Sequence, residues 1–227
     1  MKTNRIYLSV TLALLCFVSQ NGLAAEKQKH DYDRWEKSIS QFEKQDQKQG
    51  IKKNGVLFAG SSSVRLWDLD KYFPELKAIN RGFGGSEIVD STHFADRIIL
   101  KHEPKLIFLY AGDNDLSRKK SPEEVASDFQ KFVATVHKTL PQTKIVFIAV
   151  KPSLKRWNLA ETIKKANQLI ADQCANNCLL EYADVWKPML GADGKPRPEL
   201  FKSDGLHLNH AGYLVWGKAV QPFLDQK

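Results

Sequence analysis

The sequence predicts an α/β fold in which a doubly wound, five-stranded parallel sheet is covered by helices on both faces. Short apolar runs alternate five times with longer helical patterns, which is typical of repeated strand–helix–strand units. The runs are rich in β-branched and aromatic residues and are nearly continuous, as expected for strands buried on both faces. Right-handed crossovers between five such strands favour the strand order 2-1-3-4-5.

The N-terminal segment has the layout of a secretory signal peptide. Lys2 and Arg5 precede a mainly apolar stretch over residues 6–18, and small residues follow it. This stretch is shorter than the roughly 20 apolar residues that span a bilayer. We therefore expect residues 1–25 to be removed on export to the periplasm or medium, leaving residues 26–227 as a single domain without a stable membrane anchor.

The elements follow in chain order after the signal peptide. Residues 26–52 form a helical lead-in, because apolar side chains at helical spacing predict an amphipathic helix over 29–50: Tyr32, Trp35, Ile39 and Phe42. The apolar runs predict strands over 55–60, 76–80, 105–112, 144–150 and 178–184. The patterns with helical period predict helices over 63–70, 88–101, 122–139, 158–175 and 209–224.

The charge pattern argues against nucleic-acid binding. The formal net charge of +8 falls to +6 once residues 1–25, with two basic and no acidic residues, are removed. The remaining charges alternate in sign along predicted helix faces, which is typical of solvated surfaces. They do not gather into a basic face with interleaved aromatics, as nucleic-acid-binding proteins usually show.

Two cysteines remain after the signal peptide, because Cys16 lies within it. Cys174 and Cys178 bracket a short loop before the last predicted strand, and a cysteine pair in an exported protein predicts a disulfide. Two free thiols are the alternative. A metal site is disfavoured because no histidine lies nearby at ligand spacing.

Chemically distinctive residues follow the predicted strands, and ligands of such sheets bind at the carboxyl ends of the strands. Four segments are involved: "GSSS" (60–63), "NRGFGGSE" (80–87), "GDND" (112–115) and "SDGLHLNHAGY" (203–213). Taken singly, each has a plain explanation as a helix cap, a glycine turn or an acidic loop. Together they supply a serine on a strand-to-helix turn, N–H donors, an amide and an Asp–His pair, which are the groups of nucleophilic acyl transfer.

These segments resemble the sequence blocks of the SGNH/GDSL hydrolases, the GDSL-type esterases and lipases, over about residues 55–221. The resemblance implies a flavodoxin-like three-layer α/β/α sandwich. It implies a catalytic triad of Ser62, Asp204 and His207, and an oxyanion hole formed by the backbone N–H groups of Ser62 and Gly85 and the side-chain amide of Asn114. It implies neither a metal ion nor an organic cofactor.

One departure concerns the first block, which usually reads Gly-Asp-Ser and here reads Gly60-Ser61-Ser62. The missing acidic residue is not a triad member, so we expect its loss to affect how the turn is braced rather than the chemistry. The serine run also leaves the register open. Ser62 aligns with the family nucleophile, and Ser61 or Ser63 remains the alternative.

Other polar residues have weaker assignments. Arg65, Arg81, Arg118 and Trp157 are candidates for the mouth of the site, with surface packing as the alternative. We expect His210 to face solvent or cap the last helix, and Asp113 and Asp115 to brace the loop around Asn114.

The expected activity is hydrolysis of a carboxylic ester through an acyl-enzyme on Ser62. The loops between the motifs are short and polar, with no long apolar insertion that would form a lipid-binding lid. This favours short acyl groups, acetyl first, on a small-molecule or glycan carrier. The alternatives are a lysophospholipase or thioesterase-type lipolytic enzyme, and a non-catalytic binding protein on the same fold.

Overall fold

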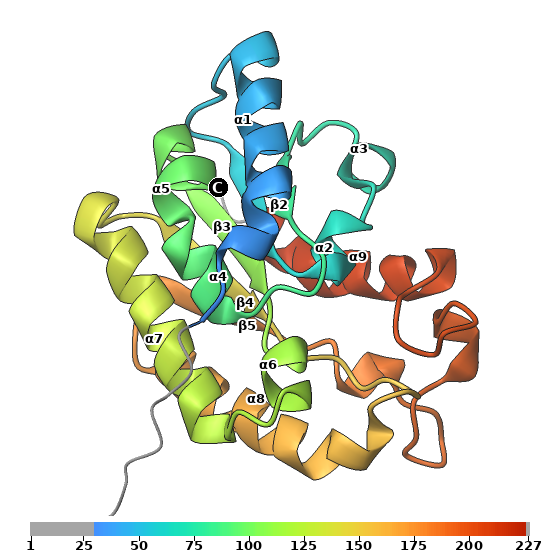
Figure 1. Cartoon of the computed structure of the whole chain (residues 1–227). Coiled ribbons are helices and arrows are strands. Elements are labelled where there is room, and N and C mark those ends of the chain that lie inside the picture. Colours follow the sequence, from blue (N-terminus) through green and yellow to red (C-terminus); the bar gives the residue numbers. More distant parts are fainter. Residues whose placement is uncertain (1–29, 226–227) are drawn as a thin grey trace, which may run out of the picture. The chain divides into compact units, whose positions relative to one another are not determined.

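The five strands form one parallel sheet in the order β2-β1-β3-β4-β5, which confirms the order predicted from the sequence (Figure 1). Their bounds are β1 Val56–Gly60, β2 Ile79–Gly82, β3 Leu106–Tyr110, β4 Lys144–Ile148 and β5 Leu180–Ala183. The computed structural model describes residues 30–225. The predicted signal peptide therefore lies outside the described residues.

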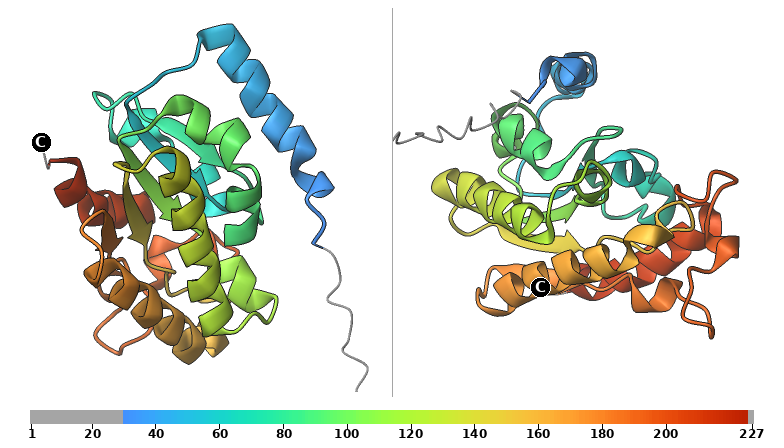
Figure 2. Two further views of the ribbon diagram at one scale, coloured as in Figure 1. Left: turned by 90° about the vertical axis from the view of Figure 1, so that its left-hand side faces the viewer. Right: turned by 60° about the horizontal axis from the view of Figure 1, so that its bottom comes forward.

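Helices cover both faces of the sheet, as Figures 1 and 2 show, so the predicted three-layer architecture is confirmed. The layer on one face consists of α1 (Glu36–Gln49), α4 (Ile88–His93), α5 (Ala95–Ile98), α7 (Pro122–Thr139) and α8 (Ala160–Ala175). The layer on the other face consists of α2 (Ser62–Arg65), α3 (Leu69–Tyr72) and α9 (His210–Leu224). Short helix α6 (Asp113–Ser117) follows β3, and 3₁₀ turns cover Asp33–Trp35, Leu100–His102, Trp157–Leu159, Lys187–Met189 and Pro198–Leu200.

The strands are apolar at successive positions because each face is buried under its own helices. In β1, Leu57 and Ala59 belong to the core under α4, α5, α7 and α8, whereas Phe58 belongs to the core under α2 and α9. Phe58 packs there in an aromatic cluster with Trp67 of the α2–α3 connection, and Trp67 contacts Trp216 of α9 edge to face at 5.5 Å between ring centroids. Among residues 30–225, no helix is long and apolar enough to span a membrane.

The second strand lies later in the chain than predicted, at 79–82 rather than 76–80. Its register with β1 pairs Ile79 with Leu57 and Gly82 with Gly60. A Cβ on Gly82 would lie 2.8 Å from the Cβ of Val64 and closer still to the backbone nitrogen of Arg65. Only glycine therefore lets the strand continue beneath α2, and this contact is not visible in the local sequence.

Arg81 is neither at the mouth of the site nor at the surface, the two places that the sequence left open for it. It pairs in register with Ala59, which places its side chain under α1, where it is only 3% exposed. Its guanidinium donates to the Asp46 carboxylate of α1 and, at 3.1 Å, to Nε2 of His102. Arg81 therefore anchors α1 to the edge strand of the sheet.

The predicted disulfide between Cys174 and Cys178 is also wrong, because both thiols are free in the structure. Cys174 is 6% exposed, in the last turn of α8 and packed into the core. The chain then turns through Asn177, whose N–H bonds the Cys174 carbonyl at 3.1 Å, and Cys178 is exposed beyond it. Burial raises the pKa of the Cys174 thiol to about 12, which opposes the thiolate that oxidation requires.

Candidate active site

The serine run lies on a sharp turn between β1 and α2. Gly60 has φ +124°, and a Cβ there would lie 2.7 Å from the carbonyl carbon of Tyr110 in the neighbouring strand β3. Ser61 and Ser63 are 0% and 1% exposed, whereas Ser62, the first residue of α2, is half-buried. Of the three serines, Ser62 is therefore the one that presents its hydroxyl to the carboxyl end of the sheet.

His207 reaches this hydroxyl from the loop that precedes α9. Its Nε2 lies 3.0 Å from the Oγ of Ser62, and its Nδ1 lies 2.6 Å from Oδ2 of Asp204. Because a carboxylate only accepts hydrogen bonds, Nδ1 carries the proton and Nε2 presents its lone pair to the Ser62 hydroxyl. The structure thus joins three of the predicted residues, which lie up to 145 positions apart, in one chain of contacts.

Asp204 is fixed by the loop that it organises. Its Oδ1 accepts the backbone N–H groups of Leu206 and His207, both at 2.9 Å, so the turn holds the carboxylate and the imidazole on one side. The hydrogen bond from His207 and these two backbone bonds hold the pKa of the Asp204 carboxyl well below its usual range. The carboxylate therefore stays ionised, and it can stabilise an imidazolium formed when His207 takes a proton.

The other two predicted residues lie on neighbouring loops at the same edge of the sheet. Because β1 lies between β2 and β3, the loops that follow these strands meet above its end. The side-chain amide of Asn114 in α6 donates to the carbonyl of Ser86 at 2.9 Å, next to Gly85, which has φ +75°. One N–H of the Asn114 amide remains for a further acceptor.

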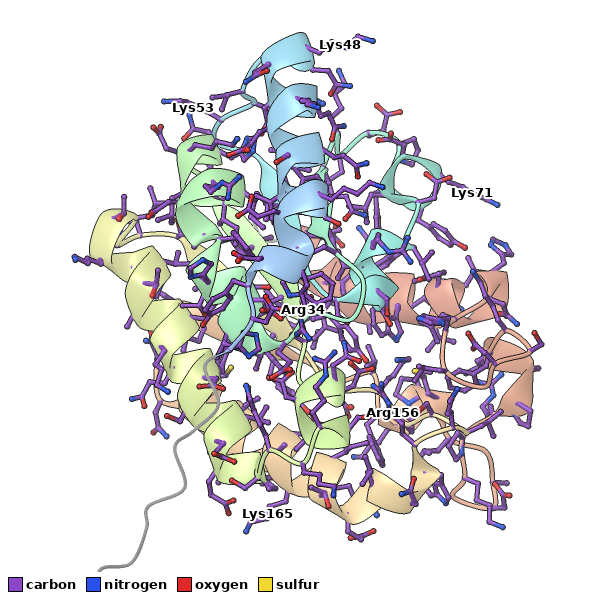
Figure 3. All side chains as sticks on the ribbon, in the orientation of Figure 1. Arg34, Lys48, Lys53, Lys71, Arg156 and Lys165 are labelled. Atoms are coloured by element: carbon purple, nitrogen blue, oxygen red, sulfur yellow. The ribbon has the colours of Figure 1, made fainter. Side chains whose placement is uncertain are left out.

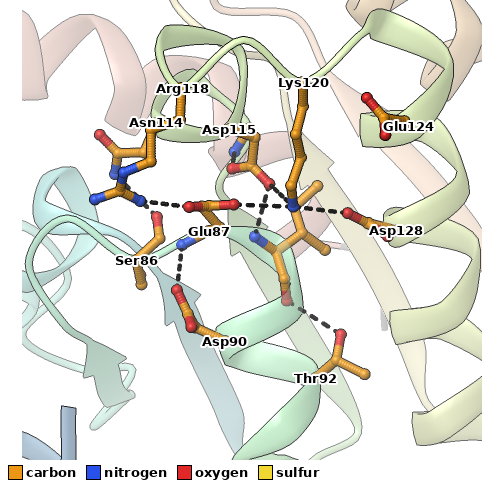
Figure 4. Close-up of polar contacts among 12 residues, drawn as sticks. Ser86, Glu87, Asp90, Thr92, Asn114, Asp115, Arg118, Lys120, Glu124 and Asp128 are labelled. Atoms are coloured by element: carbon orange, nitrogen blue, oxygen red, sulfur yellow. Dashed lines mark hydrogen bonds and ion pairs between the residues drawn. The ribbon is translucent and has the colours of Figure 1, made fainter. Parts of the chain in front are cut away.

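A cluster of charged side chains joins these two loops (Figure 4). The ammonium of Lys120 lies 2.9 Å from Glu87, 3.3 Å from Asp115 and 2.8 Å from Asp128. Glu87 follows Ser86 and Asp115 follows Asn114, so one lysine connects both donor-bearing segments. Burial acts to lower the pKa of Lys120, but the three carboxylates outweigh it and raise that pKa.

Asp115 also determines the local backbone, which explains why a helix forms where the sequence indicated a turn. Its Oδ2 accepts the N–H of Gly112 at 3.1 Å, which caps the start of α6, and its Oδ1 accepts the N–H of Ile88 at 3.2 Å, at the start of α4. This carboxyl is fully buried, and burial raises its pKa to about 6. Asp115 thus braces the segment that carries Asn114.

Two cationic residues of the site were not singled out from the sequence. Lys151, only 1% exposed, donates to the hydroxyl of Tyr110 at 3.0 Å and lies 3.3 Å from Asp113. Arg156 lies 3.1 Å from the same carboxylate and donates to Oδ1 of Asn114 at 3.0 Å. The available signal was the basic segment "KPSLKRW" directly after the fourth strand.

The remaining candidates lie around the site without joining its central contacts. Arg118 bonds Glu87 at 2.5 Å, Arg65 lies beside Gly84, and Trp157 stacks on Trp186 with ring centroids 6.0 Å apart. His210 is exposed, and its Nδ1 lies 2.7 Å from the hydroxyl of Tyr72. Within residues 30–225, no three His, Cys, Asp or Glu side chains converge as a metal site would require.

Comparisons with known proteins agree with this fold. The sequence model of the GDSL-like lipase/acylhydrolase family matches residues 62–215. A Streptococcus pneumonia protein, provisionally described as a platelet activating factor, superposes with a TM-score of 0.76 at 23% identity, covering 85% of this chain and 93% of its own. No curated protein matches the sequence.

Two further solved structures share the fold. A GDSL-like lipase from Bacteroides thetaiotaomicron has a TM-score of 0.68 at 18% identity, covering 86% of this chain and 98% of its own. A catalytic mutant of an acetylxylan esterase from Geobacillus stearothermophilus has a TM-score of 0.61 at 13% identity, covering 78% of this chain and 97% of its own. At these identities the likeness shows the fold.

Proposed function

Because the chain belongs to the GDSL-like lipase/acylhydrolase family, we propose that it is a serine esterase that hydrolyses carboxylic esters through an acyl-enzyme on Ser62. The observation that carries this proposal is the continuous contact from the Ser62 hydroxyl through the His207 imidazole to the Asp204 carboxylate, at 3.0 and 2.6 Å. A nucleophile, a base and a residue that orients the base are the three groups that acyl transfer needs.

The proposed reaction has two halves. His207 takes the Ser62 proton through Nε2 while the serine oxygen attacks the acyl carbon, and the imidazolium then gives that proton to the departing alcohol. Water repeats the sequence on the acyl-enzyme and releases the carboxylic acid and the free serine. The N–H groups of Ser62 and Gly85 and the free N–H of Asn114 receive the oxyanion, and each such donor contributes about 10²–10³ in rate.

The proposed substrate carries a short acyl group, acetyl first, on a polar carrier such as a glycan. Two observations support it. Arg118, with 42% of its side chain exposed, gives the surroundings of the site a polar, basic character. The fold is shared with an acetylxylan esterase.

Turnover of p-nitrophenyl acetate, butyrate and octanoate by residues 26–227 tests both the reaction and the acyl length. We expect the acetate to be the fastest and Ser62→Ala to lose at least about a thousandfold in kcat. Ser61→Ala and Ser63→Ala are the matched controls, and we expect them to retain turnover. Activity that survives Ser62→Ala but not one of these would move the nucleophile to that neighbour.

Two other outcomes would favour the two alternative functions, a lipolytic enzyme or a non-catalytic binding protein. Faster hydrolysis of octanoate and of lysophosphatidylcholine than of acetate would indicate a lipolytic enzyme. No turnover, together with no labelling by a serine-reactive phosphonate, would indicate a binding protein on this fold, because labelling requires an activated serine.

We also propose that the protein is exported, with residues 1–25 acting as the signal peptide. Expression of the full chain in a Gram-negative host, followed by N-terminal sequencing of the periplasmic fraction, tests this. The expected mature N-terminus is Ala25 or Glu26, and an intact Met1 on protein retained in the cytoplasm would refute export.

A further inference from the structure

Asn114 can serve the oxyanion only in one of its two amide orientations. With Nδ2 toward the site it presents an N–H to the developing charge, whereas the flipped amide presents an oxygen, which repels it. The carbonyl of Ser86, 2.9 Å from Nδ2, favours the productive orientation because a carbonyl only accepts. This contact uses one of the two Nδ2 hydrogens and leaves the carbonyl end of the amide to be fixed by another residue.

Arg156 fixes that carbonyl end. Its guanidinium donates to Oδ1 of Asn114 at 3.0 Å, and a guanidinium carries only donors, so a flipped amide would set donor against donor here. The flip would also set oxygen against oxygen at Ser86. Figure 3 shows Arg156 beside α6, inside the outline of the protein, whereas the labelled Lys48 and Lys165 point outward.

Arg156 is itself held in place by the buried carboxylate of Asp113. Its guanidinium forms an ion pair with the carboxylate of Asp113 at 3.1 Å. That carboxylate accepts hydrogen bonds from Lys151 at 3.3 Å and from the Tyr110 hydroxyl at 3.2 Å. Tyr110 and Lys151 are almost fully buried, and Asp113 is 6% exposed. The guanidinium of Arg156 therefore lies between the buried Asp113 carboxylate on one side and the Asn114 amide on the other.

We propose that Arg156 is a positioning residue that orients and polarises the Asn114 amide toward the oxyanion, with Asp113 and Lys151 holding it in place. The positive guanidinium draws electron density toward Oδ1, which makes the free N–H of Nδ2 a stronger donor. Arg156 thus acts on the reaction through Asn114 and not through contact with the substrate. This inference rests on the proposed esterase function.

A double-mutant cycle on the short-acyl ester tests the inference. Arg156→Met should lower kcat by up to about a hundredfold, the cost of a misplaced catalytic group, with KM changed less than about threefold. In the Asn114→Ala background the same substitution should have no further effect, because the group that it positions is absent. Lys155→Met, which removes an exposed cation from the same loop, is the matched control and should leave kcat unchanged.

Two outcomes of the cycle would overturn the inference. Losses that multiply in the double variant would show that Arg156 acts independently of Asn114. A rise in KM at constant kcat would place Arg156 in contact with the substrate. Arg156→Lys serves as the second variant should Arg156→Met fail to fold. Its ammonium retains the charge beside Asp113, but it lacks the planar guanidinium that faces Asp113 with one nitrogen and donates to Asn114 with the other.

A spectroscopic measurement separates this inference from the esterase proposal. The side-chain ¹⁵NH₂ pair of Asn114, assigned by its absence in Asn114→Ala, should shift and exchange faster with solvent in Arg156→Met than in Lys155→Met. This readout requires no turnover, so an inactive wild type would refute the esterase while leaving the orientation of Asn114 measurable. An unchanged Asn114 signal in Arg156→Met would refute the positioning role.

Discussion

Gly60→Ala tests whether the nucleophile turn depends on a residue without a side chain. Gly60 has φ +124°, which costs an L-residue about 1–2 kcal/mol. A Cβ would also lie 2.7 Å from the carbonyl carbon of Tyr110 and nearer still to its oxygen. Because Tyr110 belongs to β3, the central strand, this backbone cannot move aside, and overpacking of this kind adds about 1–3 kcal/mol.

We therefore expect Gly60→Ala to lower the free energy of unfolding by about 2–5 kcal/mol, measured by urea denaturation with circular dichroism. Gly194→Ala is the matched control, because Gly194 has φ +72° and a Cβ there would meet no atom within 4 Å. It should lose only the conformational part, about 1–2 kcal/mol. Equal losses in the two variants would show that β3 yields to the added methyl group and would refute the argument.

Three further predictions follow from burial. Arg81→Met should cost about 1–3 kcal/mol, because it removes a buried guanidinium from the Asp46 carboxylate and leaves only the half-buried Lys101, at 2.7 Å, to pair with it. Arg97→Met, whose ion pairs with Glu36 and Glu43 are half-exposed, should cost under about 1 kcal/mol in the same urea assay. In the folded protein iodoacetamide should alkylate Cys178 and spare the buried Cys174, as mass spectrometry of peptides would show. Burial raises the pKa of Asp115 to about 6, so between about pH 4 and 6 the folded state holds a proton that the unfolded chain releases. The free energy of unfolding of the wild type should therefore fall as the pH rises through this window. Measured relative to Asp115→Asn, the fall should be at most about 3 kcal/mol.

The fold was predictable from the sequence because its signals are local. Each strand is a short apolar run, and the order of strands follows from the handedness of the connections. The bounds of β2 were not predictable, since they depend on Gly82 passing beneath α2, a contact with a distant segment. The helix at Asp113–Ser117 was missed for a similar reason, because Asp115 caps it and also binds the backbone of Ile88.

The contacts of the site were likewise predictable where they are local and unpredictable where they join distant segments. Asp204 and His207 are three residues apart, so their contact could be anticipated from one turn of chain. Arg156 bonds a residue 42 positions earlier, and nothing in its own segment distinguishes it from the exposed Lys155. Arg81 shows the converse: it lies within the 80–87 segment that carries Gly85, yet its side chain points into the core under α1. Proximity in sequence is therefore informative within a turn and uninformative across the sheet.

Ser61 shows how the turn holds without the acidic residue that the family's first block usually carries. Its N–H bonds the Tyr110 carbonyl at 2.9 Å and its own carbonyl accepts from Val64 at 3.0 Å, so the backbone braces the turn. Its side chain is 0% exposed, and its Oγ has no hydrogen-bond partner among residues 30–225. A carboxylate there would be buried without a partner, which costs more than burying a hydroxyl. Ser61→Ala should therefore be at least as stable as the wild type, whereas Ser61→Asp, although it restores the usual residue, should lower the free energy of unfolding. Equal stability of Ser61→Asp and the wild type would mean that this turn already offers a carboxylate a partner.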